Sequence, residues 1–116
     1  MPTTLYGFNS CDTVKKARKW LEAHGVAHEF FDYRKDKLDA KTVERWFRKA
    51  GWEAVFNRNS TTFKELSDAV RASIDEKKAK EMILAETNLI KRPVLDLGDR
   101  VYAGFKPEVY SAAFDK

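Results

Sequence analysis

Residues 5–17 read Leu-Tyr-Gly-Phe-Asn-Ser-Cys-Asp-Thr-Val-Lys-Lys-Ala, and inside this stretch a short aromatic run gives way to a helical pattern. The run Leu5–Phe8 is apolar and bounded by polar residues, which predicts a strand. From Asp12 to about His24, apolar residues recur at helical spacing with Lys and Arg on the opposite face, and Gly25 follows as a stop. The chain therefore passes from a strand to an amphipathic helix at Cys11.

Cys11 is the only cysteine of the chain, and its place at this junction favours chemistry. The first turn of a helix exposes unpaired N–H groups and the positive end of the helix dipole, and both stabilise a thiolate. A cysteine in such a setting has a pKa below that of a free thiol, so its nucleophilic form is populated near neutral pH. The alternative is a small buried hydrophobe, as most unpaired cysteines are. Partner residues elsewhere in the chain must decide between the two.

The middle of the chain predicts a second strand and then several helices. Residues 27–33 are rich in aromatic side chains and end in a charged turn, which is typical of a strand. Asp39 is placed to cap a helix that ends before Gly51. Two further stretches, Thr62-x-x-Glu65 and Ser73-x-x-Glu76, have capping-box spacing and predict a short helix and a longer one that reaches about residue 86.

The last third of the chain predicts a hairpin and a final helix. Residues 93–97 and 100–103 are strand-like, Gly98-Asp99 suits the turn between them, and Pro107 suits the start of a helix. Because a helix joins the first two strands, they should be parallel with a right-handed crossover, whereas the hairpin must be antiparallel. We expect one α/β domain over residues 1–116, with a mixed four-stranded sheet flanked by helices and a helical insertion at about residues 39–88.

Charge and composition argue against several classes of protein. The net charge is +4, but 22 Lys and Arg are interleaved with 18 Asp and Glu, which indicates a solvated surface and not a nucleic-acid interface. No apolar run is long enough to span a membrane, and no leader peptide is expected. One cysteine excludes an internal disulfide, and His24 and His28 lack the additional ligands that a metal site needs. We expect a cytoplasmic monomer that binds no nucleic acid, membrane or metal.

Two short stretches are basic without acidic neighbours, namely Asn57-Arg58-Asn59 and Lys91-Arg92-Pro93. A guanidinium offers several donors in a planar fork that suits arsenate, phosphate, sulfate or a carboxylate. Both stretches also belong to a set of motifs between residues 5 and 114: residues 6–17, Asp32-Tyr33, Gly51-Trp52, Asn57-Arg58, Thr61-Thr62-Phe63, Ile90-Lys91-Arg92-Pro93 and Gly104-Phe105. With these motifs in this order, the chain resembles the arsenate reductase (ArsC)-related proteins, and within them the YffB-type thiol reductases.

The resemblance implies a thioredoxin-like fold and a site built around one cysteine. Cys11 matches the reactive cysteine of the family, and Arg58 and Arg92 match two arginines that bind the anionic part of a substrate. Pro93 matches a cis-proline at the start of the third strand. A cis bond there would leave the backbone of Arg92 available to a bound peptide thiol such as glutathione.

Four more residues are candidates for anion or substrate binding in the same site. Ser10 and Thr13 are placed either to donate a hydrogen bond to the thiolate or to serve as ordinary helix caps. Asp12 suits the first turn of the helix, although its charge opposes thiolate formation. Lys91 is typical of the YffB type and flanks the expected pocket.

Two departures from the family pattern narrow the chemistry. Arsenate reductases carry a third anion-binding arginine after the hairpin, where this chain has Gly104, with Lys106 as the nearest cation. Position 14, where a CxxC pair would have its resolving cysteine, is Val14. A mixed disulfide on Cys11 must therefore be resolved by an external thiol.

Together with the resemblance, these residues predict a glutathione-dependent thiol oxidoreductase that uses Cys11 as its nucleophile and has no permanently bound cofactor. Its expected partners are glutathione, as co-substrate, and a small oxidised or oxyanion substrate. A genuine arsenate reductase is an alternative that uses the same scheme. An alternative of another class is a regulator like the Spx proteins, which bind RNA polymerase; the missing CxxC pair and the presence of Arg58 and Arg92 argue against it. A third is a domain that binds small thiols without turnover.

Overall fold

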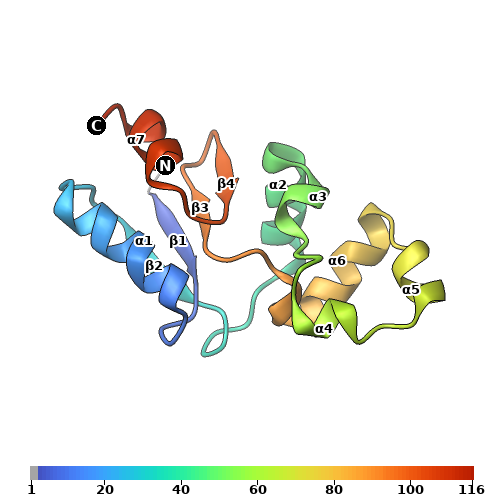
Figure 1. The fold of residues 1–116 in the computed structure, drawn as a ribbon. Coiled ribbons are helices and arrows are strands. Elements are labelled where there is room, and N and C mark those ends of the chain that lie inside the picture. Colours follow the sequence, from blue (N-terminus) through green and yellow to red (C-terminus); the bar gives the residue numbers. More distant parts are fainter. Residues whose placement is uncertain (1–2) are drawn as a thin grey trace. The chain divides into compact units, whose positions relative to one another are not determined.

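The computed structural model describes residues 3–116, which separate into two units (Figure 1). The first unit contains residues 3–36 and 92–116 and holds the whole sheet, whereas the second contains residues 37–91 and is helical. The helical insertion expected at about residues 39–88 falls within the second unit. The expectation that residues 1–116 form one domain stays a prediction.

The sheet of the first unit is mixed and has the strand order β2-β1-β3-β4. Strand β1 (Thr4–Gly7) pairs in parallel with β2 (Glu29–Asp32), with Gly7 opposite Asp32. On its other side β1 pairs antiparallel with β3 (Val94–Asp96), which forms the predicted hairpin with β4 (Val101–Ala103). The α/β class and the mixed four-stranded sheet are therefore confirmed.

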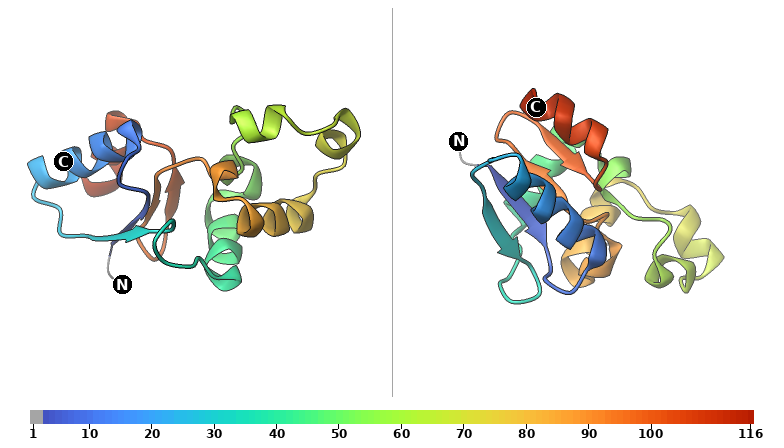
Figure 2. Two further views of the ribbon diagram at one scale, coloured as in Figure 1. Left: turned by 90° about the horizontal axis from the view of Figure 1, so that it is seen from below. Right: turned by 60° about the vertical axis from the view of Figure 1, so that its left-hand side comes forward.

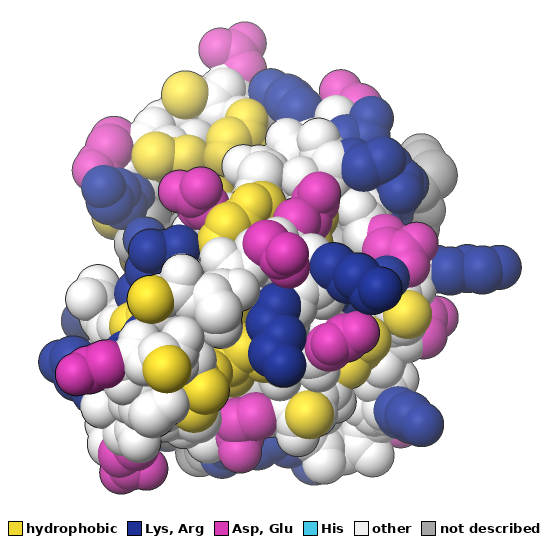
Figure 3. Space-filling view, turned by 90° about the vertical axis from the view of Figure 1, so that its right-hand side faces the viewer, with side chains coloured by type: hydrophobic (Ala, Val, Ile, Leu, Met, Phe, Trp, Pro, Cys, Tyr) yellow, Lys and Arg dark blue, Asp and Glu magenta, His cyan; other side chains and the backbone are white. Residues whose placement is uncertain are grey.

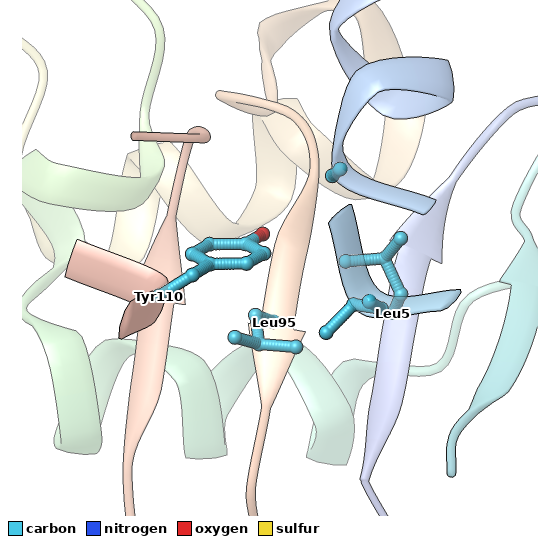
Figure 4. Close-up of a cluster of buried hydrophobic side chains, with 5 residues drawn as sticks. Leu5, Leu95 and Tyr110 are labelled. Atoms are coloured by element: carbon cyan, nitrogen blue, oxygen red, sulfur yellow. The ribbon is translucent and has the colours of Figure 1, made fainter. Parts of the chain in front are cut away.

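Helices α1 (Asp12–Ala23) and α7 (Pro107–Phe114) cover one face of this sheet (Figure 2). Figure 4 shows why: Leu5 of β1 and Leu95 of β3 are neighbours in the sheet, and Tyr110 of α7 packs over them. Ala17 and Leu21 of α1 complete the cluster. These five side chains are at most 1% exposed, so burial of their apolar surface fixes both helices to the sheet.

The approach of α1 to β1 depends on a glycine. A Cβ atom added at Gly7 would lie 2.7 Å from Cγ2 of Val14, which is itself fully buried. Any larger residue at position 7 would therefore push the first turn of α1, and with it Cys11, away from the strand.

The second unit consists of short helices around an apolar core. They are α2 (Ala40–Ala50), α3 (Trp52–Val55), α4 (Thr61–Lys64), α5 (Asp68–Ala72), α6 (Glu76–Ala85) and the 3-10 turn η1 (Thr87–Leu89). Asp39 caps α2 as predicted, because its Oδ1 accepts the N–H of Thr42 at 2.8 Å. The core side chains come from four of these helices and the segments beside them: Leu38, Val43, Trp46, Phe47, Val55, Phe56, Ala79, Ile83, Leu89 and Ile90.

The two predicted capping boxes of this unit are wrong. Helix α4 is capped by Ser60, whose Oγ accepts the N–H of Phe63, and not by Thr62. Helix α6 is capped by Asp75, whose Oδ1 accepts the N–H of Lys78, and not by Ser73. A carboxylate interacts more favourably than a hydroxyl with the positive end of a helix dipole, which explains why Asp75 prevails.

Charged side chains of both signs are mixed over the face of the molecule shown in Figure 3, with apolar side chains between them. This mixture agrees with the interleaving seen in the sequence. No helix within residues 3–116 combines the length and the apolar character needed to cross a bilayer.

Candidate active site

The Cys11 thiol lies where β1 ends and α1 begins. Cys11 is the N-cap residue of α1, with an extended backbone (φ −80°, ψ 125°), and its side chain is partly exposed. Its N–H donates to the carbonyl of Phe8 at 3.3 Å, and its carbonyl accepts the N–H of Lys15 at 3.0 Å. The strand-to-helix junction predicted for the only cysteine is therefore present.

Arg92 reaches this thiol from the start of β3. Its Nε–H donates a hydrogen bond to Sγ of Cys11 at 3.3 Å. The Arg92–Pro93 peptide bond is cis, as the resemblance implied, and the carbonyl of the buried Pro93 accepts the N–H of Gly104 at 2.9 Å. Of the predicted site residues, the structure thus brings Cys11, Arg92 and Pro93 together.

The surroundings of Cys11 favour its thiolate. Burial of the sulfur raises its pKa, but the N–H of Val14, the Arg92 guanidinium and the N–H of Thr13 lower it by more, so the pKa of Cys11 lies below that of an ordinary thiol. The sulfur accepts no capping hydrogen bond of regular geometry from the described residues. The two N–H groups of the first turn of α1 nevertheless point their positive ends at the thiolate and stabilise it.

Phe8 supports three side chains at this end of the sheet. The guanidinium carbon of Arg34 lies 3.5 Å from the centroid of the Phe8 ring, and that of Arg92 lies 4.8 Å from it. The ring of Tyr33 meets Phe8 edge-on, with 6.1 Å between centroids. Phe8 is only 6% exposed, so these cation–π contacts are partly desolvated and hold both arginines in place.

Sequence reasoning missed Asp32 as part of the site. This carboxylate is 9% exposed, and it accepts the N–H of Asn9 on Oδ2 at 3.3 Å and the N–H of Arg34 on Oδ1 at 2.9 Å. It thereby joins the loop that carries Cys11 to the loop that follows β2. Its position after a run of aromatic residues suggested a strand end, and nothing in that pattern showed that a carboxylate would be buried there.

Tyr33 was predicted as part of a strand and of the Asp32-Tyr33 motif, but without a role in the site. It follows β2 and its N–H donates to the carbonyl of Gly7 at 3.1 Å. Its hydroxyl is buried and has no hydrogen-bond partner among residues 3–116. Burial raises the pKa of Tyr33 to about 12. By smaller amounts, the charge of Arg92 lowers this pKa and that of Cys11 raises it. A polar group that is buried close to the thiol is a candidate for the site.

The other predicted residues fall outside this cluster of contacts. Ser10 and Asp12 are exposed and flank Cys11 in the chain, and Thr13 contributes through its backbone. Lys91 has an exposed side chain, and its N–H donates to the carbonyl of Val55 in the helical unit at 2.7 Å. Anion or substrate binding by these four residues stays a prediction.

Arg58 belongs to the helical unit. It lies in the exposed turn between α3 and α4, and its guanidinium carbon is 5.5 Å from the centroid of the Trp52 ring. Asn57 shapes this turn, because its Oδ1 accepts the N–H of Asn59 at 3.0 Å. A role for Arg58 beside Cys11 stays a prediction.

The structure accounts for both departures from the family pattern, Gly104 in place of an arginine and Val14 in place of a resolving cysteine. Gly104 has a φ of +81°, a backbone conformation that is strained for arginine, and Lys106 is exposed at the start of α7. Val14 is buried against Gly7, so this position serves the packing of α1.

Comparison with known proteins relates the chain to one family. The ArsC family model matches residues 6–113. The solved structure of a YffB protein is 50% identical, with a TM-score of 0.89 over 96% of this chain and 97% of the other. The solution structure of an arsenate reductase (ArsC) related protein from Brucella melitensis is 45% identical, with a TM-score of 0.79 over 100% and 97%. The global transcriptional regulator Spx 2 of Oceanobacillus iheyensis is 28% identical over 90% of this chain and 78% of its own length.

Proposed function

This chain belongs to the ArsC family, and on that premise we propose that it is a glutathione-dependent thiol oxidoreductase in which Cys11 is the only reacting thiol. The observation that carries the proposal is the hydrogen bond from Nε of Arg92 to Sγ of Cys11 at 3.3 Å. A guanidinium held in this way stabilises the thiolate that attacks and the thiolate that leaves.

The reaction follows from the chemistry of one thiolate. Cys11 attacks a sulfur of an oxidised substrate or of glutathione disulfide, so one S–S bond forms as another breaks and a thiolate leaves. A glutathione thiolate then attacks the glutathione sulfur of the mixed disulfide and releases Cys11. An outside thiol is required for this step because position 14 is Val14 and the chain has no second cysteine. Such a cycle suits a reducing compartment, and we place it in the cytoplasm.

The test is intact-mass analysis of the protein after incubation with glutathione disulfide. We expect one glutathione adduct on wild-type protein, its removal by reduced glutathione, and no adduct on Cys11→Ser. Steady-state oxidation of glutathione in the presence of a panel of disulfides then distinguishes turnover from binding alone. A wild-type protein that takes up no glutathione would contradict the proposal.

Arsenate reduction is a narrower version of the same scheme. Here Cys11 would attack arsenic, and Arg58 and Arg92 would bind the oxyanion. The conformation of Gly104 disfavours the third arginine of that chemistry. We therefore expect arsenate to support much slower oxidation of glutathione than small disulfides do; comparable rates would favour arsenate as the substrate.

A regulator that binds RNA polymerase is the second candidate, because the chain is also similar to Spx 2. The chain has a thiol that Arg92 hydrogen-bonds and no CxxC pair, which favours reaction of Cys11 with small thiols. Co-purification with the α subunit of the polymerase, with the cellular phenotype unchanged in Cys11→Ser, would favour the regulator.

A further inference from the structure

Two polar atoms at the Cys11 site are buried without a hydrogen-bond partner within residues 3–116: the hydroxyl of Tyr33 and Nη1 of Arg92. The Tyr33 residue is only 5% exposed. Buried polar groups in folded proteins are nearly always hydrogen-bonded, so two such donors beside one reactive thiol require an explanation.

Both atoms belong to side chains that gather around Phe8 and the thiol. Tyr33 and Arg92 each contact the Phe8 ring, at 6.1 Å and 4.8 Å from its centroid. Nε of the Arg92 guanidinium bonds the sulfur at 3.3 Å, and Nη1 is part of the same small rigid plane. The charges of Arg92 and Cys11 both act on the Tyr33 hydroxyl, which places it within electrostatic range of the two.

The type of atom that these donors suit follows from their chemistry. Oxygen is a strong hydrogen-bond acceptor and thioether or disulfide sulfur is a weak one. Because the donors are buried, only a small group bonded to the Cys11 sulfur or directly against it can reach them. The carboxylates of glutathione lie several bonds from its sulfur, whereas an oxygen atom bonded to Sγ of Cys11 lies next to the Arg92 guanidinium. With a pKa of about 12, Tyr33 keeps its proton at physiological pH and remains a donor.

We propose that Cys11 also reduces small hydroperoxides, and that the Tyr33 hydroxyl and the Arg92 guanidinium donate hydrogen bonds to the oxygen atom that the sulfur receives. The thiolate attacks one peroxide oxygen, and an S–O bond forms as the O–O bond breaks. The leaving alkoxide or hydroxide takes a proton from water. Sulfur is thereby oxidised by two electrons to a sulfenic acid, and the peroxide is reduced to an alcohol or to water.

Regeneration rests on the function proposed above. The thiol of glutathione attacks the sulfenic sulfur, an S–S bond forms, and the hydroxyl leaves as water with the thiol proton. A second glutathione then reduces the mixed disulfide, which yields glutathione disulfide and the Cys11 thiolate.

The experiment measures the rate at which hydrogen peroxide oxidises Cys11, by intact mass spectrometry with dimedone present to trap the sulfenic acid. Wild type is compared with Tyr33→Phe and with Tyr110→Phe. Tyr110 is the matched control because its hydroxyl is also buried without a partner in the described chain, but in the core of the sheet unit.

We expect Cys11 in Tyr33→Phe to be oxidised at least about tenfold more slowly than in wild type, because a preorganised donor to a developing charge is lost. Tyr110→Phe should stay within about twofold of wild type, because it removes no such donor.

Equal rates in the two variants would overturn the role of Tyr33, and wild-type protein that forms no dimedone adduct would overturn peroxide reduction itself. The reaction with glutathione disulfide is measured on the same samples. A wild type that forms the dimedone adduct but no glutathione adduct supports peroxide reduction and contradicts glutathione dependence, so the two proposals fail separately.

Discussion

The sheet unit and the helical unit bury different kinds of side chains. Within residues 3–116 both buried carboxylates, Asp32 and Asp96, lie in the sheet unit, together with the hydroxyls of Tyr33 and Tyr110. The described helical unit buries the indole N–H of Trp46 but no carboxylate; its core is otherwise hydrocarbon, and polar side chains such as Asp39 lie at exposed helix caps. Burying a polar group costs stability unless it is well partnered, so the sheet unit carries a cost in stability that the helical unit largely avoids.

The largest expected effect on stability comes from the core of the helical unit, and it should leave the Cys11 site unchanged. Ile83→Ala in α6 should lower the free energy of unfolding by about 2–5 kcal/mol, because it leaves a cavity at a fully buried position. The pKa of Cys11 should not change, since every group that shifts it lies in the sheet unit. Urea unfolding and the pH dependence of iodoacetamide alkylation measure the two quantities. A shift in the alkylation profile would show that the units share the site.

Loss of the Asp32 carboxylate should damage both stability and chemistry. Asp32→Ala leaves the N–H groups of Asn9 and Arg34 without their acceptor, at a cost of about 1–3 kcal/mol, and should slow alkylation of Cys11 because its loop is released. Asp96→Ala is the matched control, because it removes the other buried carboxylate, which accepts the N–H of Gly98. An equal loss of Cys11 reactivity in both variants would show that burial of charge, and not the link between the two loops, is what matters.

Arg92→Gln tests the electrostatics of the thiol. Arg92 lowers the pKa of Cys11, so its removal raises that pKa and moves the rise of alkylation with pH to higher pH. At neutral pH the rate should fall several-fold, whereas at high pH, where the thiol is ionised in both proteins, the rates should converge. Arg34→Gln, which removes the other guanidinium on Phe8, should shift the profile less. Identical shifts would contradict the importance of the Nε–Sγ bond.

The smallest expected effect lies at a helix cap. Asp39→Ala should cost about 1 kcal/mol of stability, as cap substitutions do, and leave Cys11 unchanged. The hydrogen bond from Thr42 lowers the pKa of Asp39, so the stabilisation is present above the pKa of an unfolded aspartate and is lost as pH falls through the lower folded value. Thermal unfolding of the two proteins should therefore differ less in acid than at neutral pH. Asp39→Ser, which retains a capping oxygen, should recover most of the loss.

Sequence alone predicted the sheet unit better than the helical one. In the sheet unit the apolar periodicity of α1, the turn at Gly98 and Pro107 at the start of α7 agree with one another. In the helical unit α3 and α5 are only four or five residues long, so no periodicity marks them. Ser60, Thr61 and Thr62 all lie at the start of α4, and Ser73 and Asp75 both precede α6, so local spacing does not decide which of them becomes the cap.

Sequence alone also predicted only part of the candidate site. Cys11 and Arg92 are in motifs that distinguish the family, and the structure joins them by a hydrogen bond. Asp32 ends β2 and Tyr33 follows it. Both belong to one of the motifs shared with the family, but their role depends on burial against the loop of another strand. That contact spans 23 residues along the chain, a separation at which hydrophobic patterning carries no information.

The pair of guanidinium groups held on Phe8 also has a consequence for the kinetics of encounter. Two positive charges on the Phe8 ring, close to a partly exposed thiol, attract anions before any contact forms. The association of Cys11 with glutathione disulfide, which carries several carboxylates, should therefore slow as salt is added, since the Debye length falls to about 8 Å at physiological ionic strength. A neutral disulfide should meet the same thiol at a rate that salt hardly changes. Ionic strength thus alters which of the competing oxidants reaches Cys11 first.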